Sequence, residues 1–286
     1  MQAANPELAI EFADQFALTK KFALQNLQSA ALLALTVPSA GQAGSSASVT
    51  VRVTNRTGHK LPTGYADGRR VVVQLSVDGQ IFTGDFDAGS LINDGQLRVY
   101  EAQHGRAAIG VSDHLALHEA VVKDSRIPPA GMVATAATQP VAVSWFDQSD
   151  GGLRDYDETT FAVPLAPTLS DGAKVKVVVR LLYQSTTPEY VAFRAAENRT
   201  DTSGQRLQQI YEATGRGPPI QMAQAEGELT VSRPQLSTVD AGTGSEGVGS
   251  CHCQSGSGVT GLAVWLLLAG RRKKKSPQPG HSHAER

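Results

Sequence analysis

The chain has 286 residues, with 26 lysine and arginine side chains against 27 aspartate and glutamate side chains. A chain of this length can bury a core without cross-links, as one large domain or two small ones. The nearly balanced charge argues against a protein that binds nucleic acid through a strongly basic surface, so no nucleic-acid partner is expected. The two cysteines, Cys251 and Cys253, lie outside the segments that look folded and therefore cannot staple the main domain.

The first expected element is a helix from Asn5 to about Leu35, within a linking segment over residues 1–40. Asn5 can cap the helix, Pro6 suits the first helical position, and apolar residues recur along the segment at roughly helical spacing. Pro38 and the glycines after it stop the pattern. The apolar stripe of this helix is expected to pack on another part of the protein.

Residues 41–234 are expected to form an antiparallel, immunoglobulin-like β-sandwich, so the predicted fold class is mainly β. Short β-branched runs alternate here with Gly, Pro, Asp and Asn, without long crossover helices between them, which favours a sandwich over a parallel α/β sheet. A short amphipathic helix is expected late, from Gly204 to Thr214. The expected strands are 48–54, 70–77, 97–101, 115–122, 140–146, 159–163, 174–184 and 228–233.

Behind the sandwich, residues 235–258 read as a flexible stalk, because this Ser/Thr/Gly-rich stretch has almost no bulky apolar residues to offset the entropy of ordering. A short apolar helix and a basic stop follow over 259–275, and a disordered tail over 276–286. As a helix the apolar run spans only about 18 Å, against roughly 30 Å of bilayer hydrocarbon, which is too short for a stable span by itself. The basic stop consists of Arg271, Arg272, Lys273, Lys274 and Lys275.

A cysteine cluster, a short apolar run and a basic block, in that order, resemble the C-terminal sorting tail of myxobacterial surface proteins, called MYXO-CTERM. The resemblance implies contact with the membrane, processing by a sorting protease near Cys251 and Cys253, and a place at the cell surface or outer membrane. The positive-inside tendency likewise puts the sandwich outside the cytoplasm. The extension 276–286 departs from the usual tail. Two alternatives are a buried apolar strand and a Cys-x-Cys metal site with His252, His281 and His283.

The N-terminus lacks the basic and apolar regions of an export signal. A C-terminal stop has no effect on a protein that is not exported. The expectation is therefore that upstream sequence carrying the signal is missing, and the alternative is a start assigned to the wrong methionine.

The most specific stretch is 53–71, which is predicted as a strand, an exposed turn and a second strand. It resembles the Asn-x-x-x-Gly-His-x-x-Pro-Thr-Gly…Arg-Arg segment of the β-rich C-terminal domains of bacterial multihaem c-type cytochromes of the cytochrome c-554-like kind. The turn exposes His59 and Lys60. Its structural residues are expected to be Gly58, Pro62 and Gly64, followed by Arg69 and Arg70.

Further landmarks of that domain follow in order, so that the resemblance covers about 7–232. They lie at 97–101, 122–131, 178–185 and 210–215, and the second contains the turn residues Asp124 and Arg126. The departure is the complete absence of Cys-x-x-Cys-His, the attachment motif of c-type haem. This chain therefore binds no haem covalently, and haem is expected only through a partner or a missing upstream segment.

His59 is the candidate cofactor residue, because the resemblance implies an axial haem ligand in a partner and neutral imidazole suits haem iron. The plainer alternative is that His59 and Pro62 hold a turn. His114 and His118 would share a face of the expected strand at about 13 Å, too far apart for one ion, so they are taken as solvated or structural. Arg69, Arg70, Asp124 and Arg126 are expected to form polar ties between loops. Scattered carboxylates at strand ends are expected to be solvated, namely Glu101, Asp147, Asp155 and Asp157.

No catalytic motif is found in the sequence, and no enzyme activity is expected. The predicted function is a surface-anchored, non-catalytic module with a docking or structural role in electron transfer, as the C-terminal part of a longer or split cytochrome. Its expected partner is a multihaem cytochrome polypeptide. The alternative is a cell-surface module that binds carbohydrate or protein.

Overall fold

The computed structural model describes residues 6–233 except 66, 107, 109, 137–144 and 146–151. These residues belong to one unit of the chain, which comprises residues 1–236. The expected stalk, apolar helix, basic stop and tail lie outside the described residues, as does the expected strand 140–146 apart from Trp145. None of the described helices is long and apolar enough to cross a membrane.

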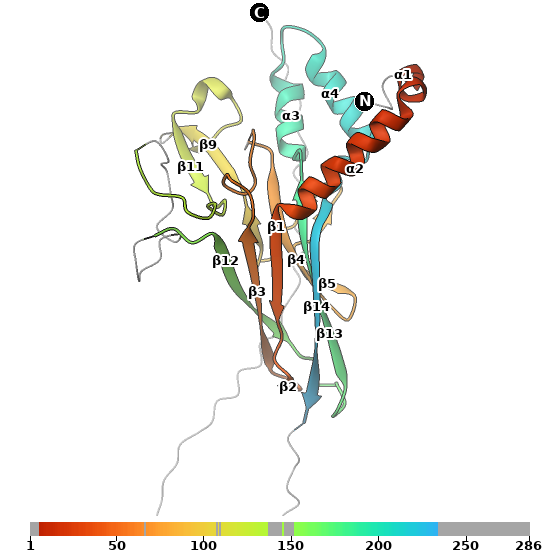
Figure 1. Cartoon of the computed structure of the whole chain (residues 1–286), viewed down its shortest axis with the longest axis vertical. Coiled ribbons are helices and arrows are strands. Elements are labelled where there is room, and N and C mark those ends of the chain that lie inside the picture. Colours follow the sequence, from red (N-terminus) through yellow and green to blue (C-terminus); the bar gives the residue numbers. More distant parts are fainter. Residues whose placement is uncertain are drawn as a thin grey trace, which may run out of the picture. The chain divides into compact units, whose positions relative to one another are not determined.

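Two β-sheets make up the body of the protein, which confirms the mainly β fold class (Figure 1). All pairings in them are antiparallel except that of β2 with β14. The first sheet has the order β1 (Ala31–Thr36), β3 (Ser46–Asn55), β12 (Tyr156–Pro164). The second has the order β2 (Ala40–Gln42), β14 (Ile220–Ser232), β13 (Lys174–Gln184), β4 (Arg70–Val77), β5 (Gln80–Thr83), and β8 (Arg98–Tyr100) also pairs with β4.

The core lies between the inner faces of the two sheets. Along β3 every second side chain is buried, as expected for a strand with one face in the core and one in water. Strands β4 and β13 supply the opposite wall, and their bounds agree with the expected strands 70–77 and 174–184. The buried core residues include Val49, Val51, Val53 and Phe161 from the first sheet and Val71, Val73, Leu75, Val177, Val179 and Leu181 from the second.

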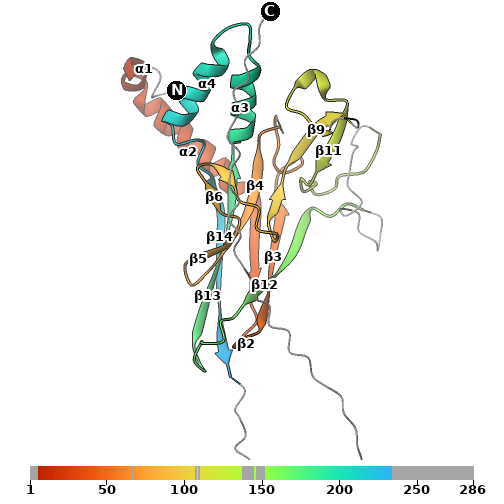
Figure 2. The ribbon, with the colours of Figure 1, turned by 180° about the vertical axis from the view of Figure 1, so that it is seen from behind.

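Helices and a small sheet gather at one end of the sandwich, called the helical end below (Figure 1 and Figure 2). They are α2 (Ala13–Ser29), α3 (Pro188–Glu197), α4 (Ser203–Ala213) and the sheet of β10 (Gly110–Val111), β9 (Ala102–Arg106) and β11 (Ala120–Asp124). Helix α1 (Pro6–Glu11) precedes α2, and a two-stranded ribbon pairs β6 (Phe86–Asp87) with β7 (Ser90–Leu91). Helix α4 confirms the helix expected at 204–214, whereas α3 was not expected.

The strand expected over 115–122 is wrong in its first half. Leu115–Leu117 forms a 3₁₀ turn, and β11 begins only at Ala120. The turn is capped by His114, whose Nδ1 accepts a hydrogen bond from the Ala116 backbone N–H at 3.3 Å. A local side-chain acceptor of this kind competes with strand pairing.

The expectation that the first helix reaches Leu35 is also wrong. Helix α2 ends at Ser29, and residues 31–36 form β1, which pairs with β3 along its whole length from Ala31 opposite Asn55 to Thr36 opposite Thr50. An almost continuous apolar run fits a helix or a strand equally well. The free edge of β3 decides between them, because pairing satisfies its backbone groups and lets Leu33 and Leu35 pack against the core.

Neighbouring leucines on β1 differ in burial, and this difference can be tested by their effects on stability. Leu33→Ala should lower the free energy of unfolding by about 1–2 kcal/mol. This is less than the cost of truncating a fully buried leucine, because the Leu33 side chain is only half-buried against the core. Leu32→Ala, on the exposed face of the same strand, should cost less than about 0.5 kcal/mol. Urea unfolding measures both. A larger loss for Leu32→Ala would contradict the alternation of β1.

Candidate functional site

The loop that carries His59 joins β3 to β4 and is held by Asn55, a buried side chain at the end of β3. The Asn55 amide Nδ2 donates to the His59 carbonyl at 2.7 Å and to the Ile127 carbonyl at 2.9 Å. Its Oδ1 accepts from the backbone N–H and the hydroxyl of Thr57, each at 2.8 Å. One amide therefore closes the turn and ties it to a segment 72 residues away.

Asp124 makes a second tie between the same two segments. Its carboxylate accepts from Lys60 Nζ at 3.0 Å and from Arg126 Nε and Nη2 at 2.9 and 2.8 Å. Burial by itself raises the pKa of Asp124, but the hydrogen bonds and charges of Arg126 and Lys60 outweigh it and hold that pKa below its ordinary value. The backbones of Leu61 and Ile127 bond to each other in both directions beside this tie.

His59 itself is exposed, and within the described residues only its backbone has hydrogen-bond partners. Gly58 beside it is open to solvent, and Pro62 follows a cis peptide bond. The loop touches the end of α2, because the Arg56 backbone N–H donates to the Ala30 carbonyl at 2.9 Å. The imidazole of His59 is thus offered to solvent at the helical end, and its role as a haem ligand stays a prediction.

The two adjacent arginines of the motif have different surroundings. Arg69 folds back over its own loop, where Nη1 donates to the Thr63 carbonyl at 3.1 Å and covers Gly64, whose φ is +83°. Arg70 is buried and donates through Nε to Gln184 Oε1 at 2.7 Å. Burial lowers the pKa of Arg70. Arg70 thus joins β4 to the end of β13 from inside the fold.

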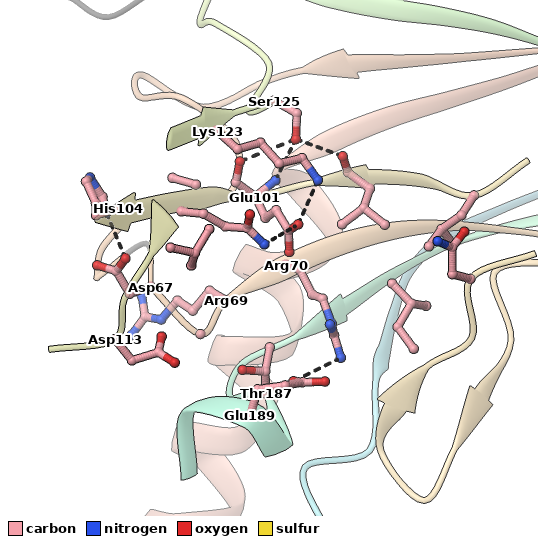
Figure 3. A pocket seen from close by; sticks show the side chains of 18 of the residues that line it. Asp67, Arg69, Arg70, Glu101, His104, Asp113, Lys123, Ser125, Thr187 and Glu189 are labelled. Atoms are coloured by element: carbon pink, nitrogen blue, oxygen red, sulfur yellow. Dashed lines mark hydrogen bonds and ion pairs between the residues drawn. The ribbon is translucent and has the colours of Figure 1, made fainter. Parts of the chain in front are cut away.

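A cavity of about 610 Å³ lies beside Arg70, between β4, β8, β9 and the start of α3 (Figure 3). Its lining is rich in charged side chains of both signs. Among these side chains, Lys123 Nζ lies 2.8 Å from Glu101, and Arg70 Nη2 lies 3.8 Å from Glu189. The charged residues that line the cavity are Asp67, Arg69, Arg70, Arg98, Glu101, Asp113, Lys123 and Glu189.

One edge of this cavity carries a cluster of Asp67, His104 and His118. His104 Nδ1 lies 2.7 Å from Asp67 Oδ1, and His118 Nδ1 lies 3.9 Å from Asp67 Oδ2. The two imidazole rings are stacked with centroids 5.1 Å apart. Asp113 is close by, and burial together with the charge of Asp67 raises its pKa. Among the described residues these three side chains are the group with the donor atoms of a metal site.

On spacing alone, His118 is compared only with His114, and both are expected to be solvated or structural. His114 caps the 3₁₀ turn and packs its ring edgewise against Phe193, with centroids 6.3 Å apart. His118 instead meets Asp67 and His104, neither of which stands out in the sequence. No local spacing marks such a group, because its members come from three separate segments. For α3 a local signal was present, since Thr187 caps the helix just before Pro188 at its first turn.

The expectation that the carboxylates at strand ends are solvated is wrong for two of them. Glu101 is paired with Lys123, and Asp157 is buried against Arg98 and Tyr100 from the opposite sheet. Both find a cation on a strand that only the tertiary fold brings near. Asp155 uses its backbone carbonyl to accept from the Asn55 N–H at 2.8 Å. Asp147 lies outside the described residues, as do Cys251, Cys253 and the basic stop.

No family model and no curated protein matches the chain. Among solved structures, a penta-heme cytochrome c552 from Thermochromatium tepidum is similar at 13% identity and a TM-score of 0.44, over 72% of this chain and 41% of that one. Spo0M, a sporulation control protein from Bacillus subtilis, is similar at 11% identity and a TM-score of 0.26, over 71% of this chain and 49% of that one. The chain thus spans less than half the length of either, and both likenesses are weak.

Proposed function

We propose that the sandwich is a non-catalytic module that docks its helical end against a haem-bearing polypeptide. The observation that carries this proposal is helix α2, which exposes Leu18 and Phe22 to solvent although Leu27 near its end packs against the core. The resemblance of the His59 loop to that of multihaem cytochromes supports the choice of partner class. The haem-bearing polypeptide is either a separate chain or another part of the same protein, a longer or split cytochrome.

Helix α2 carries apolar residues on more than one side. At 100° per residue, Leu18 and Phe22 lie one turn apart on one side, while Phe16 and Leu27 lie on another. Leu18 and Phe22 are 51% and 53% exposed, and no α2 side chain is buried by the described part of the chain. Most helical stability in proteins comes from packing an apolar face, and a helix that is apolar on several sides is typically enclosed. A partner surface would supply that enclosure.

The position of His59 supports a redox partner. Its loop is hydrogen-bonded to Ala30, the residue that follows α2, so a polypeptide that also covers this end of α2 would lie near the exposed imidazole. A neutral imidazole is a common axial ligand of haem iron. We propose that His59 serves as such a ligand in the partner.

The resemblance of the C-terminal tail to a MYXO-CTERM sorting signal supports a proposal about where in the cell this module is located. We propose that the protein is held at the cell surface, outside the cytoplasm, with a sorting protease acting near Cys251 and Cys253.

Recovery of the protein from its native cells with an antibody to the sandwich tests the docking proposal. Haem absorbance, measured as the pyridine haemochrome, should accompany the wild-type chain. If the haem-bearing polypeptide is a separate chain, a Leu18→Glu/Phe22→Glu variant should lose at least about tenfold of that haem, because charges on the contact face oppose burial. Ile81→Glu is the control and should retain the haem, because Ile81 is an apolar residue on β5 that is 44% exposed.

His59→Gln separates docking from ligation. It should leave recovery of the haem polypeptide intact but change the haem spectrum, whereas an unchanged spectrum would leave His59 with a turn role only. Wild-type protein recovered without haem would contradict the docking proposal. That outcome would favour the second candidate, a surface module that binds carbohydrate or protein, for which the polar cavity offers a place.

A further inference from the structure

We propose that Asp67, His104 and His118 bind a divalent transition-metal ion, zinc by preference, at the edge of the cavity. This site is independent of the proposed docking function. Its three side chains come from the loop between β3 and β4, from β9, and from the segment just before β11. The fold therefore brings together two imidazoles and one carboxylate that the sequence keeps apart.

The distances suit a shared ion. One donor atom from each of the three side chains lies within 4.8 Å of the other two. Zinc binds imidazole nitrogen and carboxylate oxygen at about 2.0–2.2 Å, so ligand atoms of a tetrahedral site lie roughly 3.3–3.5 Å apart. The separations of 2.7 Å and 3.9 Å from Asp67 to the two histidines lie on either side of that value. A bound ion would draw both separations toward that value.

A hydrogen bond outside the cluster orients His118 as a ligand. Its Nε2 lies 2.7 Å from the Ser112 carbonyl oxygen, which can only accept, so Nε2 carries a proton. In the neutral ring the lone pair is then on Nδ1, the atom that faces Asp67 Oδ2. A positive charge between these two atoms, from a metal ion or from a second proton on the ring, would stabilise them. Such a carbonyl partner on the far nitrogen is the usual outer support of a metal-bound histidine.

Ser112 also holds the backbone of His104 in place. The Ser112 backbone N–H donates to the His104 carbonyl at 2.9 Å, so both ligand segments are tied through Ser112. The site is shielded as well, since the side chains of Asp67 and His118 are only 7% and 12% exposed. A carboxylate buried to this extent needs a cation or strong donors beside it.

The donor set selects the metal class. Imidazole suits zinc, copper, iron and nickel, whereas magnesium and calcium prefer oxygen ligands. Three protein ligands leave a coordination position for water or a small molecule. Asp67 and His104 both line the cavity, so that position has space beside it (Figure 3). The competing interpretation is a metal-free cluster in which His104 simply donates to Asp67.

The test uses the full chain, freed of metal with a chelator. The tail contains other zinc donors, so the background variant replaces Cys251 and Cys253 with serine and His252, His281 and His283 with glutamine. This background should bind one zinc ion per chain in equilibrium dialysis, and excess magnesium should not displace it. His118→Gln should weaken zinc binding on the order of a hundredfold or more. His114→Gln, four residues earlier, is the matched control and should leave the affinity unchanged.

A second measurement needs no variant of the site itself. In the background chain the remaining histidines are His59, His104, His114 and His118. Cobalt(II) is paramagnetic, so its binding should perturb the imidazole NMR signals of His104 and His118 more strongly than those of His59 and His114. A stronger perturbation of the wrong pair, no zinc binding by the background chain, or equal affinity in a folded His118→Gln variant would overturn the site. Loss of haem in the docking experiment would not affect any of these readouts.

Discussion

Replacing Asp157 with asparagine should lower the free energy of unfolding by about 3 kcal/mol, the largest single-site effect that we expect. The carboxylate receives two parallel hydrogen bonds from Arg98 Nε and Nη2, both at 2.7 Å. Tyr100 donates its hydroxyl to the same group at 2.7 Å, and Thr159 does so at 3.1 Å. Asparagine keeps the shape but leaves the guanidinium without its counter-charge.

The position of this pair explains the size of the effect. Arg98 and Tyr100 belong to β8 in one sheet and Asp157 to β12 in the other, so the contact ties the two layers together. Breaking a fully buried pair typically costs about 3–5 kcal/mol. The low end applies because the Arg98 side chain is 36% exposed and water can partly replace the carboxylate.

The adjacent residue on the same strand is the matched control. Glu158 points away from the core and meets Arg52 Nε at 3.0 Å, with about half of each side chain exposed. Exposed pairs contribute at most about 1 kcal/mol, so Glu158→Gln should have a small effect. Urea unfolding of both variants measures the difference. Equal losses would show that the buried pair does not join the sheets.

Asp157 should also make the free energy of unfolding depend on pH in the acidic range. Burial by itself raises the pKa of Asp157, but its hydrogen bonds and charge contact with Arg98 outweigh burial and hold that pKa below the ordinary value. A carboxyl group whose pKa is lower in the folded protein stabilises it fully above the unfolded pKa of about 3.9. This contribution is lost as the pH falls through the folded pKa. Below about pH 4 the stability curve of Asp157→Asn should therefore be flatter than that of the wild type, and Asp124 and Asp201, whose pKa values are also lowered, should contribute to the remaining slope.

Asn55→Asp should be the second most damaging change, at about 2–3 kcal/mol. The amide of Asn55 donates to two backbone carbonyls, those of His59 and Ile127, and a carboxylate has no proton to donate. Both carbonyls keep one other donor, since His59 also accepts from the Thr57 hydroxyl and Ile127 from a backbone N–H. The cost therefore comes from the two lost hydrogen bonds, at about 1 kcal/mol each, and from a buried charge that faces carbonyl oxygens. The His59 loop should also loosen, so amide hydrogen exchange at Leu61, which bonds to Ile127, should become faster.

The chain offers an unusually close control for Asn55. The tripeptide Asn-Arg-Thr recurs at 198–200, where Asn198 Oδ1 again accepts from the backbone and hydroxyl of the threonine. There the amide donates to Asp201, in a solvent-exposed hydrogen bond. Asn198→Asp should therefore change stability by no more than about 0.5–1 kcal/mol. A loss as large as that of Asn55→Asp would contradict the role of the long-range bond to Ile127.

Part of the fold follows from local pattern. The β-branched runs at 70–77 and 174–184 have the period and bounding turn residues of strands, and the structure forms β4 and β13 there. The amphipathic stretch before Gly215 likewise becomes α4. Such segments are predictable because their side-chain period matches one secondary structure and their ends carry turn chemistry.

The apolar run 31–36 shows where local pattern stops being sufficient. It fits two periods, and a free strand edge 14 or more residues along the chain selects one of them. The candidate metal cluster is hidden for the same reason, since Asp67, His104 and His118 meet only after three loops have been placed by the sheets.

By itself, the sequence determined the strand-rich class, the positions of long strands such as β3, β4 and β13, and the turn chemistry around His59, since each of these depends on neighbours along the chain. The tertiary structure alone decided which of two identical Asn-Arg-Thr turns is buried, which carboxylate meets Arg98, and which histidine faces Asp67. Those outcomes depend on burial and on partners far away in the sequence. In a packed interior these partners determine whether burying a polar group stabilises or destabilises the fold. The local sequence pattern indicates only on which side of a strand or helix the side chain lies.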